Sequence, residues 1–390
     1  MANDTTVGGY VLNISPRYEN SLDIESFSRM MKNPSYCYKF FWLEAIVNLI
    51  CRDVSRTTFN EIIDEMICNA WFSVLEYHIH LSGFVEGEIR DGLENAVLLL
   101  AELSGLEANA AKPQIQNAIL RYDAELKKYK EQLTNMVPYR ALAGFFQKCE
   151  EPVNWDSTAR LVSYIERVNG INLLPYTLGP SPKLKREVCF QDAWAEMIRD
   201  NAVPILGWIA FEKTKWLQSN NPEVPGIVYK LAPMDEKMRK LGHVRELWED
   251  ILDVEPVIDV FRGGRIEKGQ YDIDHFIPWS FVLSDELWNL MPMDSSLNSS
   301  KSNKLPKWDP FFDRFAQNQY GMYRLITDES RPEFRKRYVA CFKDNLHCIW
   351  ASRELYCAGN SREQFFSILE KNMRPVYDSA RRQGYGIWNF

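Results

Sequence analysis

The chain has 390 residues, of which 46% are hydrophobic and 25% charged, and its formal net charge is −7. This length exceeds what one hydrophobic core usually serves, so we expect two or three packed units. The negative net charge argues against indiscriminate binding of polyanions over the whole surface, although basic residues can still gather locally.

The cysteines and the apolar runs indicate in which cellular compartment the protein is expected. The eight cysteines include no Cys-x-x-Cys pair, which favours free thiols in a reducing cytoplasm. Residues 1–16 lack the basic and then apolar order of a signal peptide, and no later apolar run has membrane-spanning length. We therefore expect a cytoplasmic protein that does not contact a membrane.

The first part of the chain, residues 1–169, has the pattern of a helical N-terminal domain. Apolar residues recur at intervals of three and four, as on one face of an amphipathic helix. One predicted helix starts at Tyr38, and a second follows Thr58, which can serve as its N-cap. A third is predicted over 86–103 and ends at Gly105.

One long helix is predicted from Ile115 to Met136. Its apolar residues alternate at intervals of four and three over three heptads, which indicates packing against a partner helix. The partner helix belongs either to this chain or to a second subunit, and the sequence leaves this choice open.

Residues 170–253 are expected to form a linker and a helical segment. Glycines and prolines follow one another closely at its start, which favours an extended loop. The pattern from Gln191 to Gln218 favours one or two helices, with Pro204 and Gly207 as breakers.

A strand with a polar face is predicted at residues 271–275. The alternation in Tyr-Asp-Ile-Asp places Asp272 and Asp274 on one face and the apolar side chains on the other, and His275 follows at once. Gly263 and Gly264 form a turn dipeptide, so we expect the hairpin bend before this strand.

A short helix is predicted after a wide loop. Asp294 or Ser295 can cap it and Pro306 ends it. Asn298 and Lys301 are three residues apart, so they share one face of this helix.

These residue types suit phosphodiester hydrolysis. The reaction requires an activated water, a cation that neutralises charge on the phosphate, and relief of the leaving 3′ oxygen. A neutral imidazole such as His275 is the usual base near pH 7. The oxygens of Asp274 and Asn298 are hard ligands that suit Mg²⁺ or Mn²⁺.

The stretch from Tyr271 to Pro306 resembles the HNH, or ββα-metal, endonuclease superfamily. His275, Asn289 and Asn298 match the three residues of the family name, with asparagine in the last place. The Asp-x-Asp-His start and the Asn-x-x-Lys-Ser end are similar to the HNH domain of the CRISPR-associated RNA-guided DNA nuclease. The resemblance covers roughly a tenth of the chain.

The resemblance implies a role for each matched residue. It implies that His275 is the general base, that Asp274 and Asn298 hold the metal, and that Asn289 braces the loop by hydrogen-bonding its backbone. We expect Lys301 to reach a phosphate oxygen or the transition state. Asp272 and Lys304 are expected either to contact these site residues and support them or to bind the substrate.

The predicted fold is mainly α with an embedded ββα-metal module, in a multi-domain α+β chain. We place the HNH module at residues 254–310 and a C-terminal helical region, packed on that module, at 311–390. Many HNH proteins hold the hairpin with cysteine-bound zinc, but the nearest cysteines here are Cys189 and Cys341, so no structural zinc is expected. Apolar packing must hold the hairpin instead.

A basic surplus follows the predicted metal helix. Residues 301–343 contain ten Lys or Arg side chains against five acids, where a phosphate backbone would run. A solvated amphipathic helix explains the part from Arg331 to Arg337 equally well.

The function expected from the sequence is that of a metal-dependent HNH endonuclease that nicks DNA. The DNA preference and a prokaryotic defence or mobile-element role rest on the resemblance, and RNA stays open as a substrate. One active site cuts one strand, so a double-strand break implies a homodimer or a partner defence protein. Two alternatives are a signal-gated effector whose helical body senses a partner, and an RNA-binding protein without cleavage.

Overall fold

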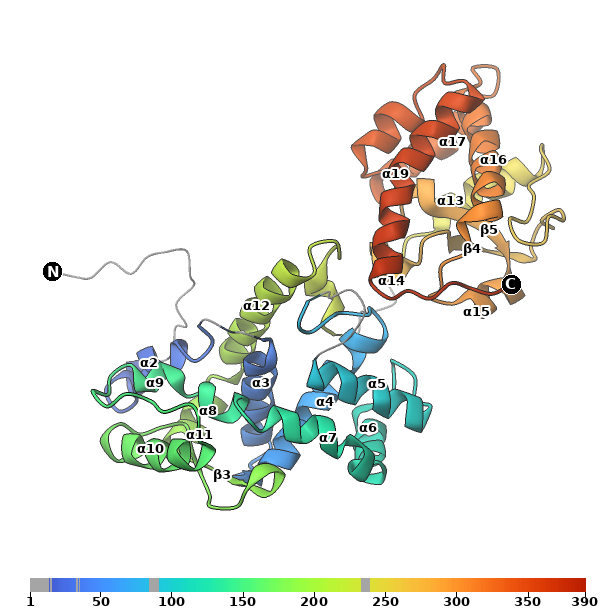
Figure 1. Cartoon of the computed structure of the whole chain (residues 1–390). Helices are drawn as coiled ribbons and strands as arrows, with labels where there is room; N and C mark the ends of the chain where they lie inside the picture. Colours follow the sequence, from blue (N-terminus) through green and yellow to red (C-terminus); the bar gives the residue numbers. More distant parts are fainter. Residues whose placement is uncertain (1–13, 15, 33, 35, 84–90, 233–238) are drawn as a thin grey trace. The chain divides into compact units, whose positions relative to one another are not determined.

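The computed structural model describes residues 14, 16–32, 34, 36–83, 91–232 and 239–390. The chain divides into two compact units: unit 1 comprises residues 1–75 and 79–222, and unit 2 comprises residues 76–78 and 223–390. One boundary between the units, after Pro222, lies within residues 170–253, where we expected a linker and a helical segment. Figure 1 labels the elements of both units.

Unit 1 is mainly helical and is built around α3 and α4, which pack against each other. In chain order its elements are α1 (Pro16–Glu19), α2 (Ile24–Ser28), α3 (Tyr38–Cys51), β1 (Arg56–Thr58), α4 (Phe59–Leu75), α5 (Gly92–Ser104), α6 (Lys112–Arg121), α7 (Asp123–Leu133), α8 (Val137–Arg140), α9 (Ala143–Phe146), α10 (Thr158–Ile171), β2 (Tyr176–Leu178), the 3₁₀ turn η1 (Lys183–Lys185), β3 (Glu187–Phe190), α11 (Asp192–Asp200) and α12 (Ala202–Asn220).

Two of the predicted helix ends are confirmed. Thr58 precedes α4, where its Oγ1 accepts from the Glu61 N–H at 3.3 Å while the Glu61 carboxylate accepts from the Thr58 N–H at 2.8 Å. The helix α5 ends at Gly105, which has a φ of 66° that few other residues adopt readily. The predicted start of α5 at residue 86 lies outside the described residues.

The prediction of one long helix from Ile115 to Met136 is wrong. The helix breaks at Tyr122, whose φ of −111° and ψ of 24° separate α6 from α7. The break lets α6 pack on α4 and lets α7 pack on α5, so the partner helices belong to this chain. Heptad spacing continues across Tyr122 because both helices present an apolar face to the same core.

The three-stranded antiparallel sheet of unit 1 was missed. Its order is β1-β3-β2, and it pairs Arg56 of β1 with Cys189 of β3, and Tyr176 of β2 with Phe190 of β3. Strands of three or four residues are too short to show a period of two.

The break between α11 and α12 lies at Asn201 and not at the predicted breakers. Asn201 has a φ of −121°, whereas Pro204 is the third residue of α12. A proline in the first turn removes an N–H that has no partner within the helix, so it does not interrupt the helix.

Unit 2 places two strands among helices. Its elements are the 3₁₀ turn η2 (Ile227–Lys230), α13 (Gly242–Leu252), β4 (Tyr271–His275), α14 (Trp279–Val282), the 3₁₀ turn η4 (Leu287–Asn289), β5 (Leu290–Asp294), α15 (Ser295–Lys301), α16 (Trp308–Thr327), α17 (Pro332–Ala340), α18 (Phe342–Asn345), the π turn η5 (Ala351–Leu355) and α19 (Arg362–Arg382). The core gathers apolar side chains from β4, β5 and helices α13, α16, α17 and α19.

The C-terminal helical region expected at 311–390 is made of several helices. The helix α17 ends at Ala340, and α19 continues through Pro375 to Arg382. Continued burial of Tyr377 and Ala380 outweighs the hydrogen bond that Pro375 removes. The aromatic C-terminus docks beside the segment that follows α15, where the Trp388 backbone N–H donates to the Leu305 carbonyl at 2.7 Å.

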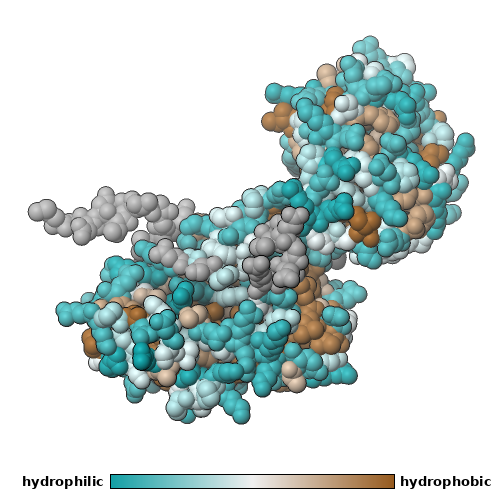
Figure 2. All heavy atoms as spheres, viewed as in Figure 1, coloured by the Kyte–Doolittle hydropathy of each residue, from teal (hydrophilic) through white to brown (hydrophobic). Residues whose placement is uncertain are grey.

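The mainly helical character expected from the sequence is confirmed, with two small sheets among the described residues. The face in view in Figure 2 is predominantly hydrophilic, with apolar side chains in small groups. None of the described helices has both the length and the apolar character that crossing a bilayer requires.

Candidate active site

The strand partner of β4 is β5. The two strands pair antiparallel from Tyr271 opposite Asp294 to His275 opposite Leu290. The expected bend at Gly263-Gly264 is present: Ile258 and Arg265 form an antiparallel bridge across it, and the Asp259 N–H donates to the Gly264 carbonyl at 2.7 Å. This bend precedes β4 but does not supply its strand partner, which is β5 and follows the wide loop after His275.

The sequence hid β5 for two reasons. Pro292 lies in the middle of it, and proline usually argues against a strand. Four successive residues of β5 are buried, so it lacks the apolar and polar alternation that marks β4. Its proline is tolerated because β4 is the only strand that pairs with β5 among the described residues, so the other edge of β5 needs no backbone N–H donor.

The helix α15 carries the next site residues against both strands. Asp294 caps it, accepting from the N–H groups of Ser296 at 2.9 Å and Leu297 at 3.2 Å. This cap is one of the two that the sequence offered. It holds α15 at the end of β5, so that Asn298 and Lys301 face β4.

Asn289 ties the loop to the strand pair. Its Oδ1 accepts from the Ile277 N–H at 2.8 Å, and its Nδ2 donates to the Ile277 carbonyl at 2.9 Å. Its own carbonyl accepts from the Phe276 N–H at 2.8 Å. The side chain is fully buried, so it holds the backbone directly after His275 and does not face solvent.

Lys301 is buried beneath the strand. Its Nζ lies 2.8 Å from Oδ2 of Asp274 and donates to the carbonyl of His275 at 2.7 Å. The lysine side chain is 1% exposed, and that of Asp274 is 15% exposed. Lys301 therefore joins α15 to the end of β4, whereas we expected it at a phosphate.

Asn298 and Asp272 lie side by side. The Asn298 Nδ2 donates to Oδ2 of Asp272 at 3.4 Å, and Arg245 lies 4.0 Å from the other carboxylate oxygen. Both side chains are partly exposed, in contrast to Lys301. Asp272 and Asp274 lie on the partly exposed face of β4, as the alternation predicted.

His275 is buried beside an aspartate that the sequence did not single out. Its side chain is 2% exposed, and its Nε2 lies 3.1 Å from Oδ1 of Asp285. The ring N–H is not well aligned with this oxygen, so the contact is close without ideal hydrogen-bond geometry. No other described residue bonds either atom.

The carboxylate of Asp285 is held in its ionised form. Burial acts to raise its pKa, but the interaction with His275, the Lys240 N–H and nearby charge outweigh burial. The pKa of Asp285 is therefore lowered from its ordinary value. In the sequence this residue is one of an Asp-Glu pair in a loop, and nothing there distinguishes it from a solvated acid.

A buried lysine supports the same loop from another side. The Lys230 Nζ donates to the Phe281 carbonyl at 2.6 Å and lies 5.1 Å from the centre of the Phe281 ring. Burial lowers the pKa of Lys230 to about 7. The loop after His275 is thus held by contacts at Ile277, Phe281 and Asp285.

Four of the nine basic side chains that follow α15 up to residue 343 are engaged by other groups of the protein. Arg324, Arg331 and Arg337 form ion pairs with nearby acids, and Arg314 donates to the carbonyls of Val260 and Phe261. Lys304 and Lys307 remain exposed directly after α15. These two lysines are the part of the surplus that lies closest in the chain to the candidate site.

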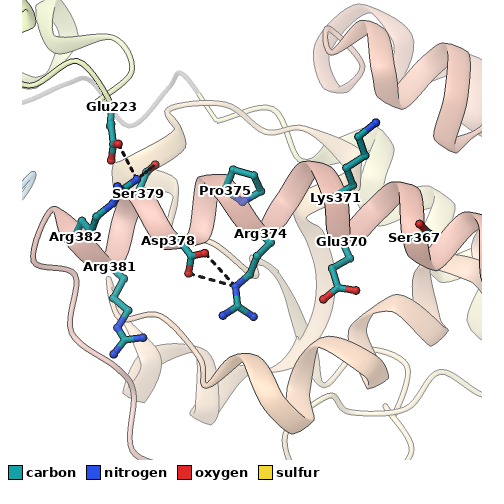
Figure 3. Close-up of a pocket in the computed structure, with 10 residues that line it drawn as sticks. All are labelled: Glu223, Ser367, Glu370, Lys371, Arg374, Pro375, Asp378, Ser379, Arg381 and Arg382. Carbon is teal, nitrogen blue, oxygen red and sulfur yellow. Dashed lines mark hydrogen bonds and ion pairs between the residues drawn. The ribbon is translucent and has the colours of Figure 1, made fainter.

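A groove of about 1120 Å³ runs along α19, apart from the predicted site residues, none of which line it. Figure 3 shows Arg374 paired with Asp378 and Arg382 paired with Glu223. Lys371 and Arg381 extend in different directions from the helix in this view. The groove therefore does not present a continuous row of basic groups.

The donor set is sparse for a metal ion. The described residues contain no group of three or more His, Cys, Asp and Glu side chains that could hold one. The hard oxygen donors present are the carboxylates of Asp274 and Asp272 and the amide oxygen of Asn298. Lys301 engages only Oδ2 of Asp274, and no other described residue bonds Oδ1.

Part of the chain matches a known protein family. Residues 262–307 match the family model described as HNH endonuclease, a range that includes β4, β5 and α15. No curated protein and no solved structure matches the chain.

Proposed function

We propose that the HNH endonuclease domain of residues 262–307 makes this chain a metal-dependent nuclease that nicks DNA. The observation that carries the proposal is the joint placement of His275, Asp274 and Asn298 on β4 and α15, which pack together. In this reading β4, β5 and α15 are the ββα-metal module.

A divalent cation fits the oxygen donors in this module. Asp274 and Asn298 would hold Mg²⁺ or Mn²⁺, with Asp272 beside Asn298 as a supporting carboxylate. Such an ion, when bound, neutralises charge on the phosphate and on the leaving oxygen. Two protein donors leave most positions to water and phosphate oxygens, as is usual for Mg²⁺.

The protein side chains supply the base and its support. His275 takes a proton from the attacking water, a new P–O bond forms, and the P–O3′ bond breaks. The leaving 3′ oxygen takes a proton from solvent, which gives a 3′ hydroxyl and a 5′ phosphate. Lys301 holds the Asp274 carboxylate and the His275 carbonyl in fixed positions. Asn289 holds the backbone at Ile277, so the imidazole remains on the rigid end of β4.

The full chain incubated with supercoiled plasmid and Mg²⁺ is expected to produce nicked circles, and excess EDTA is expected to stop the reaction. Gel electrophoresis over time measures the conversion. Nicked circles should precede any linear product, because one site cuts one strand. Conversion that EDTA does not affect would contradict metal dependence, and complete inactivity with Mg²⁺ and Mn²⁺ would favour the signal-gated alternative. The same assay with single-stranded RNA tests the other substrate.

Replacing Lys304 and Lys307 together by alanine is expected to weaken DNA binding uniformly across sequences. Each lysine that neutralises a phosphate adds about 0.9 to the slope of log affinity against log salt, so the slope should fall by about 2. Binding to a labelled duplex is measured at several salt concentrations in the His275→Ala background, which prevents cleavage.

The matched control is Lys336→Ala with Lys343→Ala, which removes two exposed lysines on α17 and α18. In Figure 1, α17 and α15 lie at opposite ends of unit 2. An equal loss of affinity in both double variants would mean that Lys304 and Lys307 contribute only overall charge.

A further inference from the structure

The loop residue Asp285 lies where it can act on the general base proposed above. It stands between α14 and η4, ten residues after His275, and is 6% exposed. An aspartate is seldom buried to this degree unless its carboxylate has partners. Each oxygen atom of Asp285 is therefore expected to have a partner.

Contacts from distant segments fix the backbone and one carboxylate oxygen of Asp285. Oδ2 accepts from the Lys240 N–H at 2.7 Å. The Asp285 carbonyl accepts from Asn345 Nδ2 at 2.8 Å, and the same Asn345 group donates to the Lys240 carbonyl at 2.9 Å. Asp285 is thus held in place by Lys240, in the segment before α13, and by Asn345, at the end of α18.

The neighbouring residue is held equally firmly. The Glu286 carboxylate accepts from the His347 N–H at 2.9 Å and from the Cys348 N–H at 3.3 Å. Its side chain is 3% exposed. The Asp285-Glu286 pair is therefore anchored to the C-terminal region and cannot move freely relative to β4.

The remaining oxygen, Oδ1, faces the His275 ring. It lies 3.1 Å from Nε2, and both atoms are buried with no other hydrogen-bond partner among the described residues. Buried polar atoms are nearly always paired in folded proteins. Among the described residues, each of these two atoms is therefore the candidate partner of the other.

We propose that Asp285 is a positioning residue for the nuclease reaction: it keeps the hydrogen of the neutral His275 ring on Nε2. The other nitrogen, Nδ1, then carries the lone pair that takes the proton from water. A carboxylate on the far side of a catalytic imidazole also favours the imidazolium that forms when the proton arrives. This inference rests on the proposed role of His275.

The first test reads the tautomer directly and needs no cleavage. In the full chain with nitrogen-15 labelled histidine, a long-range correlation spectrum distinguishes a protonated ring nitrogen from an unprotonated one. The chain has five histidines, and His275→Gln identifies the signal by its loss. We expect wild-type His275 to carry hydrogen on Nε2 at neutral pH. Hydrogen on Nδ1 instead would overturn the proposal, whether or not the protein nicks plasmid.

The second test replaces Asp285 itself and compares nicking kinetics with the His275 tautomer signal. Asp285→Asn keeps the shape but removes the charge, and we expect it to lower kcat for nicking by 10- to 100-fold with little change in KM, and to alter the His275 tautomer signal. Asp285→Glu is expected to restore part of kcat. An unchanged kcat and an unchanged signal in Asp285→Asn would overturn the proposal.

Glu286→Gln separates positioning from simple loosening of the loop. It weakens the contacts of Glu286 with His347 and Cys348 and leaves the His275–Asp285 contact in place. The His275 tautomer should therefore stay as in the wild type. If Glu286→Gln shifted the tautomer as strongly as Asp285→Asn, the effect would belong to the loop and the proposal would fail. If the wild type does not nick plasmid at all, the proposed function fails while the tautomer measurement still decides this inference.

Discussion

His275→Ala is expected to lower the rate of plasmid nicking by about 10²- to 10⁴-fold, the range that one general base supplies. The imidazole lies at the rigid end of β4, where Asn289 and Lys301 fix the adjacent backbone, and no other described histidine lies within this module. DNA affinity should change little because a buried base makes few contacts with the phosphate backbone. Nicking rate and duplex binding are measured separately.

His243→Ala provides the control for this substitution. His243 is about half exposed on α13 and lies 3.7 Å from Glu246. Its loss should leave nicking unchanged. A His275→Ala protein that keeps more than a tenth of the wild-type rate, while a matched circular dichroism spectrum shows that it is folded, would remove His275 from the role of base.

Lys301→Met is expected to destabilise unit 2 as well as to abolish nicking. The substitution leaves the carboxylate of Asp274 without its buried partner and the His275 carbonyl without a donor. Breaking a buried ion pair from one side costs about 3–5 kcal/mol. For a unit of this size we expect Tm to fall by roughly 6–12 °C, on the basis of about 3 kcal/mol. Differential scanning calorimetry of the full chain follows the transition of unit 2.

Two further variants test whether the fall in Tm comes from the loss of the buried Lys301–Asp274 pair. Lys304→Ala removes an exposed lysine of the same segment and should shift Tm by very little, since surface substitutions usually change stability by less than about 0.5 kcal/mol. Asp274→Asn combined with Lys301→Met should recover much of the lost Tm, because no unpaired charge remains buried. If Lys301→Met abolished nicking without lowering Tm, the lysine would act on the substrate, as the sequence first suggested.

The sequence by itself was most informative where several residues recur at fixed spacing within one short segment. The alternation around Asp272 and Asp274 predicted β4, and the cap at Asp294 with the spacing of Asn298 and Lys301 predicted α15. These signals are local, because strand faces and helix faces follow from periods of two and 3.6 residues. The family match at residues 262–307, described as HNH endonuclease, covers the same segment.

Only the tertiary structure decided how this segment is held. It paired β4 with β5, in which Pro292 and continuous burial had concealed the strand. It turned Lys301 inward to Asp274, and it brought Asp285 to His275 through anchors at Lys240 and Asn345. These contacts join residues 10 to 60 positions apart in the chain. The pairing of a buried charge depends on which groups the fold places beside it. No periodicity or spacing in the chain carries that information, so these contacts were beyond sequence analysis.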